Sequence, residues 1–316
     1  MLSTEVRVLE SLPFGTGRAV LDPVTGAPAQ FLDDRAPVRR FLLEQAAAPW
    51  HSVEHQWGSG HLVTDRGAAR WLTPSRLRAS DGTVEVVHTP LPGIRVEVRR
   101  SVQVLRERYT VLNSGDEPLA VTGLGIRTSF ADWYGDAQTS LEEAVRAHVL
   151  TGGTWSRVPA QPMSGEGRCL GLIVREGAVR AYSVESRNQA SLSDVRGHLV
   201  LQVTDHARNP DAFGGQPVPH LAPGESTSVA WELGWYESVD DFTAATRPPA
   251  VFSAYAAETG TPIVVNGTSG GGALASILGA SGNSGEYTPY LAAIGAAGIG
   301  AKGRSTPRDD VFAVNA

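Results

Sequence analysis

Apolar and polar side chains alternate along residues 95–127, and this pattern is the clearest structural signal in the chain. The alternating apolar positions are Val96, Val98, Val102, Val104, Tyr109, Val111, Leu119 and Val121. A period of two gives each strand one buried and one exposed face. Residues 113–118 interrupt the pattern with Asn113, Gly115 and Pro118, which favour a turn. The stretch therefore predicts an antiparallel hairpin with its charged residues outward.

Short strands separated by Gly and Pro turns recur over most of the chain. Strands are predicted at residues 5–9, 62–71, 84–88, 170–174, 179–184, 196–203 and 227–235, and residues 13–28 are read as a turn-rich entry. Residues 142–150 fit a helix or a strand equally well. Short helices are predicted at residues 36–48 and 242–245, the second opened by a capping box of Ser238 and Asp241. We therefore expect an all-β protein, a large antiparallel super-β-sandwich with one or two short helices.

The composition changes abruptly near Val265. Eleven glycines lie between Gly267 and Gly303, and this run shows neither strand alternation nor a helical face. Ordering so many glycines is costly in conformational entropy. We expect a sandwich domain over residues 1–260 and a Gly/Ala-rich tail over residues 261–316. The tail fits a flexible linker, a helical Ala/Gly segment of a following domain, or a translation out of frame that truncates a longer protein.

Charge and cysteine content exclude several classes of function. The chain has 316 residues and a formal net charge of -6, which provides no basic field for nucleic acid. The single cysteine, Cys169, forms no intrachain disulfide and lies in an apolar run typical of a buried strand. The N-terminus lacks the pattern of a secretory signal, and no apolar stretch is long enough to span a membrane. A cytoplasmic protein without a membrane partner is expected.

Residues 50–61 hold the densest group of side chains suited to binding. Three of the eight histidines and two of the seven tryptophans fall here. His51, Glu54 and His55 match the H-x-x-E-H pattern of inverted zinc proteases, but that pattern requires a helix. This segment is too short between Pro49 and Gly58 to hold one, so we expect a polar loop and no metal.

Flat aromatic faces and hydrogen-bonding rings are what a sugar requires of its binding site. The candidate substrate-binding residues are Trp50, His51, His55, Trp57, His61, Trp133, Tyr134 and Trp155. A tryptophan of a sandwich can equally be a core residue. Catalytic residues cannot be assigned, because adjacent carboxylates such as Asp33 and Asp34 do not present the separation that glycoside hydrolysis needs. No nucleotide-binding motif occurs, and no cofactor is expected.

Three stretches carry a resemblance to a known family. They are residues 108–123, the run Leu-Ala-Pro-Gly-Glu-Ser at residues 221–226, and Trp-Glu-Leu-Gly-Trp at residues 231–235. Together they resemble the N-terminal super-β-sandwich, of galactose mutarotase-like fold, found in bacterial six-hairpin glycosidases and related polysaccharide lyases. The resemblance covers roughly residues 1 to 260 and is moderately specific, since similar motifs occur in immunoglobulin-like domains.

The resemblance implies an accessory module that binds carbohydrate or has a structural role. In that family the sandwich precedes an (α/α)6 barrel, which holds the catalytic residues, and nothing in this chain resembles the barrel. The implied partners are a carbohydrate ligand, with uronate- or rhamnose-bearing glycans favoured, and a barrel in the same polypeptide. The alternative is a complete mutarotase-like sugar epimerase, which would need a His acid and a carboxylate base at one pocket.

Overall fold

The computed structural model of the chain describes a continuous β-rich body and a few short strands beyond it. Described are residues 11–44, 53–80, 82–101, 104–132, 136–151, 153–186, 197–212, 216–246, 250–252, 256–258, 265–269, 272–273 and 311–313. The prediction of a strand at residues 5–9 lies outside the described residues, as does most of the Gly/Ala-rich tail.

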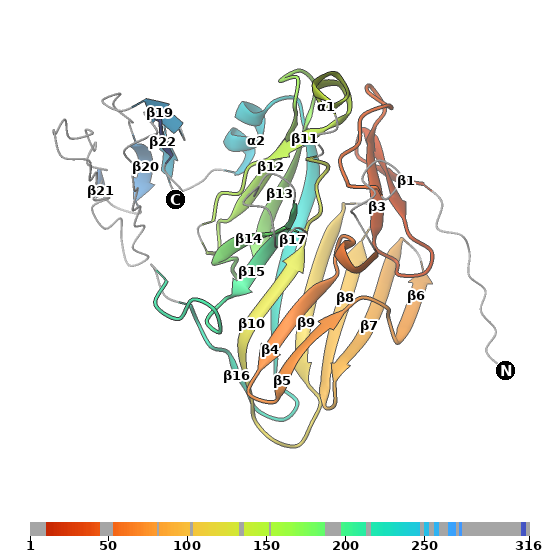
Figure 1. Cartoon of the computed structure of the whole chain (residues 1–316), viewed down its shortest axis with the longest axis vertical. Coiled ribbons are helices and arrows are strands. Elements are labelled where there is room, and N and C mark those ends of the chain that lie inside the picture. The colour runs from red at the N-terminus through yellow and green to blue at the C-terminus, as the bar shows by residue number, and fades with distance from the viewer. Residues whose placement is uncertain are drawn as a thin grey trace.

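An eight-stranded antiparallel sheet forms one layer of the body (Figure 1). Its order is β11-β12-β13-β17-β9-β8-β7-β6. The strands are β6 (Arg76–Ser80), β7 (Thr83–Leu91), β8 (Ile94–Ser101), β9 (Arg106–Asn113), β11 (Val145–Ala147), β12 (Arg157–Pro162), β13 (Cys169–Glu176) and β17 (Ser226–Tyr236). The alternating stretch that dominates the sequence supplies β8 and β9 at the middle of this sheet, and these two strands form a hairpin with each other.

A six-stranded sheet forms the opposing layer, in the order β14-β15-β10-β4-β5 with β16 paired to β10. Its strands are β4 (Gly60–Thr64), β5 (Gly67–Trp71), β10 (Leu119–Arg127), β14 (Ala181–Ser186), β15 (Gly197–Thr204) and β16 (His220–Leu221). The predicted strand at residues 62–71 is thus a two-strand hairpin, because Asp65 and Arg66 form a turn within it. The expectation of an all-β antiparallel sandwich is confirmed.

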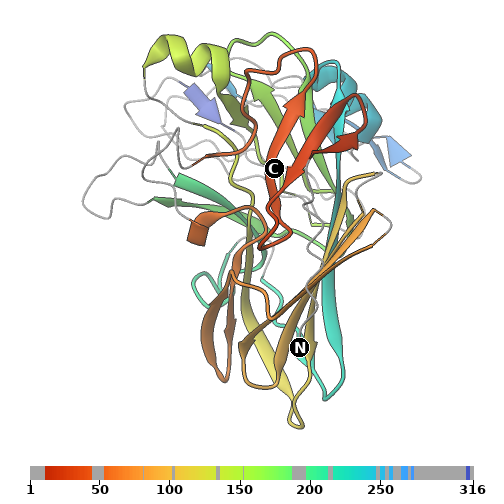
Figure 2. The ribbon, with the colours of Figure 1, turned by 90° about the vertical axis from the view of Figure 1, so that its right-hand side faces the viewer.

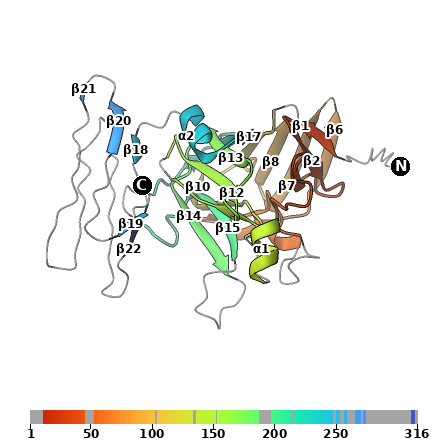
Figure 3. The same cartoon turned by 90° about the horizontal axis from the view of Figure 1, so that it is seen from above.

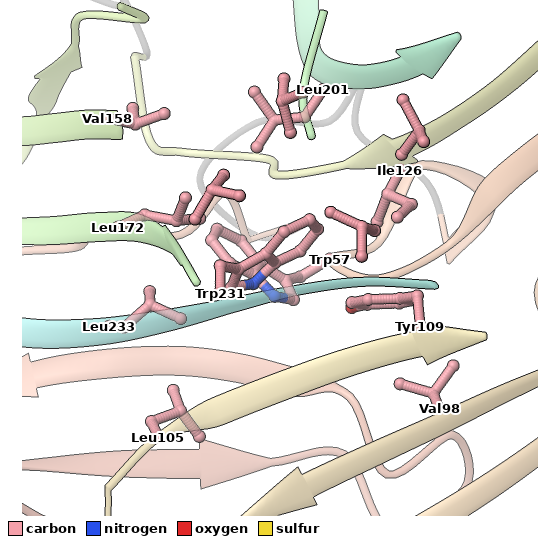
Figure 4. Packing of buried hydrophobic residues seen from close by; sticks show 14 of the residues in the cluster. Trp57, Val98, Leu105, Tyr109, Ile126, Val158, Leu172, Leu201, Trp231 and Leu233 are labelled. Atoms are coloured by element: carbon pink, nitrogen blue, oxygen red, sulfur yellow. The ribbon is translucent and has the colours of Figure 1, made fainter. Parts of the chain in front are cut away.

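The core lies between the inward faces of the two sheets (Figures 1 and 2). Figure 4 shows Trp57, Tyr109 and Trp231 packed between aliphatic side chains of both layers. The aliphatic neighbours labelled there are Val98, Leu105, Ile126, Val158, Leu172, Leu201 and Leu233. Leu105 lies in the turn between β8 and β9, and the other aliphatic residues lie on strands. Because period-two alternation places these strand residues on one side of each strand, burial of a single face fixes the register of both sheets.

A small third sheet, β1 (Leu12–Phe14), β2 (Gly17–Leu21) and β3 (Pro28–Asp33), closes one end of the core. Phe31 packs edge-on against Trp57, with ring centroids 5.5 Å apart. Phe14 packs against Trp235 at 5.9 Å. Residues 13–28, predicted as a turn-rich entry, therefore include strands whose pairing outweighs the frequent Gly and Pro.

The predicted hairpin at residues 113–118 is wrong. β9 and β10 flank this turn but belong to different sheets, so the chain crosses there from one layer to the other. Asn113 holds the crossing: its side-chain amide donates to Glu117 O at 2.8 Å and to Leu221 O at 2.9 Å. The turn residues were identified correctly, but turn chemistry does not specify which sheet receives the following strand.

The helices are short. The α1 helix (Ala137–Glu143) resolves the ambiguous stretch at residues 142–150, which continues into β11. The helix predicted at residues 36–48 is absent as far as Glu44. Arg39 donates its backbone N–H to Ala36 O in an isolated turn, and Leu42 forms a bridge with Phe130. Tertiary pairing of Leu42 with Phe130, just after β10, thus overrides the local helical pattern there. Among the described residues, no helix is long and apolar enough to cross a bilayer.

The α2 helix (Val239–Thr246) confirms the second predicted helix and lies beside β13 and β17 (Figure 3). Ser238 Oγ accepts from Asp241 N at 3.0 Å, which confirms the cap, and it donates to the Asp241 carboxylate at 2.8 Å. Phe242 packs on Cys169 and Ile173. Burial raises the pKa of the Cys169 thiol to about 12, so this cysteine is an inert core residue, as predicted.

Beyond α2 the structure describes only isolated short strands. These are β18 (Ala250–Phe252), β19 (Ala256–Glu258), β20 (Val265–Ser269), β21 (Gly272–Ala273) and β22 (Val311–Ala313). They pair among themselves, as β18-β20-β21 and β19-β22. The three readings of the tail remain predictions.

Candidate functional site

The segment that carries the predicted binding residues is fastened to the end of β10. It begins with a single 3-10 turn, η1 (Val53–His55), and enters β4 at Gly60. Gly58 N donates to Arg127 O at 2.9 Å, and Arg127 N donates to Ser59 O at 2.8 Å. Gly58 has a φ of 76°, a conformation that glycine adopts without strain. The segment is therefore fixed in position by backbone contacts.

Trp57 points into the core. Its side chain is 2% exposed and packs between Phe31 and Phe130. The indole N–H donates to Glu107 Oε2 at 2.7 Å. The ring faces of Trp57 are covered by protein, so this residue supports the segment from beneath.

Glu107 is the centre of a buried polar cluster. Trp231 Nε1 donates to the same carboxylate oxygen at 2.8 Å, and Arg100 Nε donates to Oε1 at 2.6 Å. The side chains of Arg100 and Glu107 are 2% and 0% exposed. Burial opposes the charge on Arg100, but Tyr109 and Glu107 hold its pKa above the ordinary value. The cluster satisfies a charge that the core would otherwise not tolerate.

The outward face of the six-stranded sheet carries a group of polar side chains. His55, from η1, stacks on His198 of β15 with ring centroids 4.1 Å apart and planes 12° from parallel. His198 is fully buried. Two imidazoles from residues far apart in sequence are thus brought together at one end of β15.

His61 and Gln202 meet over Gly125, which pairs with both of them across β4, β10 and β15. A Cβ built on Gly125 would lie 2.3 Å from His61 Cε1 and 2.5 Å from Gln202 Oε1. The absence of a side chain therefore makes room for the two groups to approach. Gln202 Nε2 donates to Ser183 Oγ at 2.9 Å, whereas its buried Oε1 has no hydrogen-bond partner in the described part of the chain. Such an acceptor suits an ordered water or a ligand hydroxyl.

Asp132 follows β10 and has a perturbed carboxyl group. Burial raises the pKa of Asp132 to about 7, partly opposed by a hydrogen bond from its own backbone N–H. A carboxyl group with a pKa near neutrality has the proton affinity suited to a general acid or base. It precedes Trp133 and Tyr134, which lie outside the described residues, as do Trp50 and His51.

Trp155 lies in the turn before β12, half-buried, where the Arg157 guanidinium carbon is 5.8 Å from the centre of its ring. This turn is joined to the chain just before β14, since Ser156 Oγ donates to Val179 O at 2.8 Å. Trp155 is therefore placed near the β14 side of the body and not in the segment of η1 and β4.

The H-x-x-E-H match does not form a helix at its described end, since η1 is only three residues long. In the described ranges, no three His, Cys, Asp or Glu side chains are arranged to hold a metal ion. Four polar residues of the site, Arg127, Asp132, His198 and Gln202, were not predicted. They are polar residues in or after apolar strands; the pairing of β10 with β15 brings Arg127, His198 and Gln202 to neighbouring strands, and Asp132 follows β10.

No protein-family model and no curated protein sequence matches this chain. Among solved structures, a polysaccharide lyase matches with a TM-score of 0.65 and 24% sequence identity. The matched region covers 79% of this chain and 37% of the lyase chain, so this chain spans little more than a third of that protein. The match shows the fold, and it confirms the resemblance to a sandwich related to polysaccharide lyases.

Proteins of galactose mutarotase type also match, at lower similarity. A putative aldose 1-epimerase from Escherichia coli K12 matches with a TM-score of 0.42 and 16% identity, over 72% of this chain and 98% of the other. A galactose mutarotase related enzyme from Lactobacillus acidophilus matches with a TM-score of 0.44 and 10% identity, over 73% and 98%. At these TM-scores the two matches carry no argument about function.

Proposed function

We propose that this chain is an accessory β-sandwich module of a carbohydrate-active enzyme. Its role is to bind sugar or to support a catalytic (α/α)6 barrel of the same polypeptide. The observation that supports this most is the fold match to a polysaccharide lyase of which the matched region is only 37%. The rest of such an enzyme, outside the matched region, is long enough to hold a catalytic domain.

Sugar contact is assigned to the segment of η1 and β4 and the loops around it. His55 and His61 are half-buried, so each has part of its ring at the surface. Trp50, His51, Trp133 and Tyr134, outside the described residues, complete the proposed set at this segment, and Trp155, near the β14 side, would contact a glycan that extends beyond it. Trp57 contributes by holding the segment in place through Glu107.

A second candidate function is a complete sugar epimerase of mutarotase type. The specific observation in its favour is Asp132, because burial raises the pKa of this carboxyl to about 7. Ring opening of an aldose needs one group that gives and one that takes a proton near neutral pH. In this alternative Asp132 works with an imidazole of the polar face.

One set of measurements on the whole chain distinguishes the two functions. Titration calorimetry with a panel of oligosaccharides tests binding, and polarimetry of a freshly dissolved aldose tests mutarotation. The accessory module binds glycan and leaves the mutarotation rate unchanged. The epimerase accelerates it with a pH profile that turns near pH 7 and is lost in Asp132→Asn.

His61→Ala tests the assigned contact surface, with His220→Ala as a matched control on an exposed histidine of β16. We expect His61→Ala to weaken glycan binding and His220→Ala to leave it unchanged. Equal binding by both variants would remove His61 from the site. Absence of both binding and mutarotation leaves the supporting role, which co-expression with a catalytic barrel would then test.

A further inference from the structure

Six arginines project from the outward face of strands β6, β8 and β9. We define this arginine face as Arg76, Arg78, Arg95, Arg99, Arg106 and Arg108. All six are exposed; on β8 and β9 they alternate with buried residues, and on β6 they flank the half-buried Leu77. Glu85 and Glu97 are the acidic residues at outward positions of these strands, and Glu232 of β17 and Glu176 of β13 form ion pairs with Arg106 and Arg108. The face therefore carries an excess of two positive charges (six minus four). The whole chain has a net charge of -6, so the excess is local.

Two of these arginines lie directly opposite one another. Arg99 of β8 pairs in register with Arg108 of β9, and like charges in such a pair destabilise a sheet. Arg99 reaches Glu85 at only 3.9 Å, whereas Arg108 binds Glu176 at 2.7 Å. The folding of the sheet gains nothing from placing two cations side by side. Because both side chains are exposed and each has a carboxylate partner, the cost to stability is small, and both guanidiniums are accessible at the surface.

The edge of the sheet extends the positive charge. Arg76 and Arg78 are exposed on β6, and no hydrogen bond or ion pair of either is recorded in the described structure. Charged residues protect an edge strand from pairing with another chain. The other four arginines lie on β8 and β9, and β7, which separates them from β6, contributes Glu85 to this face.

The opposite end of the same sheet face is closed. There α2 covers β13, with Phe242 packed on Cys169 and Ile173. A Cβ on Gly171 would lie 2.2 Å from the Phe242 ring, so the helix is in close contact with the strand. No helix of the described chain covers β6 to β9, and the Arg99 side chain is 68% exposed.

We propose that the arginine face binds an acidic polysaccharide, distinct from the sugar contact at η1 and β4. A guanidinium binds a carboxylate or a sulfate through two parallel hydrogen bonds. Outward side chains repeat about every 6.7 Å along a strand and neighbouring strands lie about 4.8 Å apart, which gives a grid for the repeated charges of an extended polyanion. The choice of a glycan among polyanions rests on the proposed function.

Other polyanions fit less well. Single-stranded nucleic acid uses aromatic rings for base stacking, and the outward positions of β6 to β9 contain no aromatic residue. An acidic glycan is held on this face through its charged groups, without the ring stacking proposed for the segment of η1 and β4. The carboxylates Glu85 and Glu97 reduce the field that a densely charged duplex requires. A ligand with widely spaced negative charges can instead contact arginines between the two carboxylates.

The test measures binding of the whole chain to polygalacturonate and to chondroitin sulfate, with neutral dextran, duplex DNA and poly-glutamate as comparison ligands. We expect the double variant Arg99→Ser/Arg108→Ser to weaken binding of the acidic glycans about tenfold at low salt. Glu85→Gln, which removes a competing carboxylate, should strengthen binding about twofold. The matched control is Arg208→Ser, which removes an exposed arginine outside this face.

Each outcome decides the proposal. The proposal is supported if the double variant loses affinity for the acidic glycans while Arg208→Ser keeps it, and if the parent chain binds DNA and poly-glutamate more weakly than it binds these glycans. Equal loss in Arg208→Ser, or binding of all polyanions alike, shows nonspecific charge attraction and overturns it. Absence of acidic-glycan binding also overturns it. Binding that depends on His61 and not on Arg99 and Arg108 overturns this inference while the proposed sugar module stands, and mutarotase activity overturns the module instead.

Discussion

Neighbouring arginines lie in opposite environments on the two faces of the β8–β9 hairpin. Arg100 points inward, is 2% exposed, and is bound to Glu107 at 2.6 Å. Arg99 points outward, is 68% exposed, and lies opposite Arg108. A buried charge requires an opposite charge, because desolvation costs several kcal/mol per ion. An exposed charge is screened by water, so like charges can accumulate there at little cost and become available to a ligand.

The largest expected effect comes from Glu107→Gln. The amide still accepts from the two indoles, but Arg100 is left as a charge without a counter-ion in the core. Removing one partner of a buried pair costs about 3–5 kcal/mol. Urea denaturation followed by tryptophan fluorescence would measure the loss. A change below about 1 kcal/mol would mean that water reaches Arg100 and that the two faces differ less than their exposure indicates.

The pH dependence of stability provides a second test of the inner face, through the buried residue His88. It is 5% exposed on β7, and its Nδ1 lies 3.3 Å from Thr73 O. Burial, with a smaller contribution from Arg100, lowers the pKa of His88 from 6.5 to about 4. The unfolded chain therefore binds a proton before the folded one, and stability is lost as pH falls from about 6.5 to 4. The limit of this loss is about 3 kcal/mol.

The His88→Asn variant keeps a donor for Thr73 O and removes the titration. Its stability between pH 7 and pH 4 should fall less steeply than that of the parent chain, whatever the offset at pH 7. Chemical denaturation at several pH values measures both slopes, and the carboxylates contribute equally to each. Parallel slopes would show that His88 is hydrated and can be protonated in the folded state.

Sequence reasoning predicted the layers better than their connections. Alternation identified β8, β9 and β17, because one buried face dictates period two. It did not reveal that the turn after Asn113 leads to another sheet, since that choice depends on long-range pairing with Leu221 and β15. The same limit applied to the site. His61 was chosen from a local cluster, whereas Gln202 becomes recognisable only when Gly125 brings the two side chains together.

A smaller effect is expected from Tyr109→Phe. The Tyr109 hydroxyl accepts from Arg100 Nη2 at 3.4 Å, and burial raises the pKa of the phenol far above its usual range. Because Glu107 remains as the principal partner of Arg100, the loss should be about 1 kcal/mol. Thermal unfolding would detect it. A loss as large as that of Glu107→Gln would mean that the hydroxyl, not the carboxylate, dominates the environment of Arg100.

The smallest effect on stability is expected on the outer face. Arg99→Ser removes a like-charge neighbour of Arg108 and a weak contact with Glu85 at 3.9 Å. These terms have opposite signs, so the free energy of unfolding should change by less than about 0.5 kcal/mol, toward greater stability at low salt. Denaturation at low and high ionic strength measures the difference, and added salt should abolish it. A large loss would show that Arg99 supports the sheet, and an excess of arginine on this face would then need no ligand to explain it.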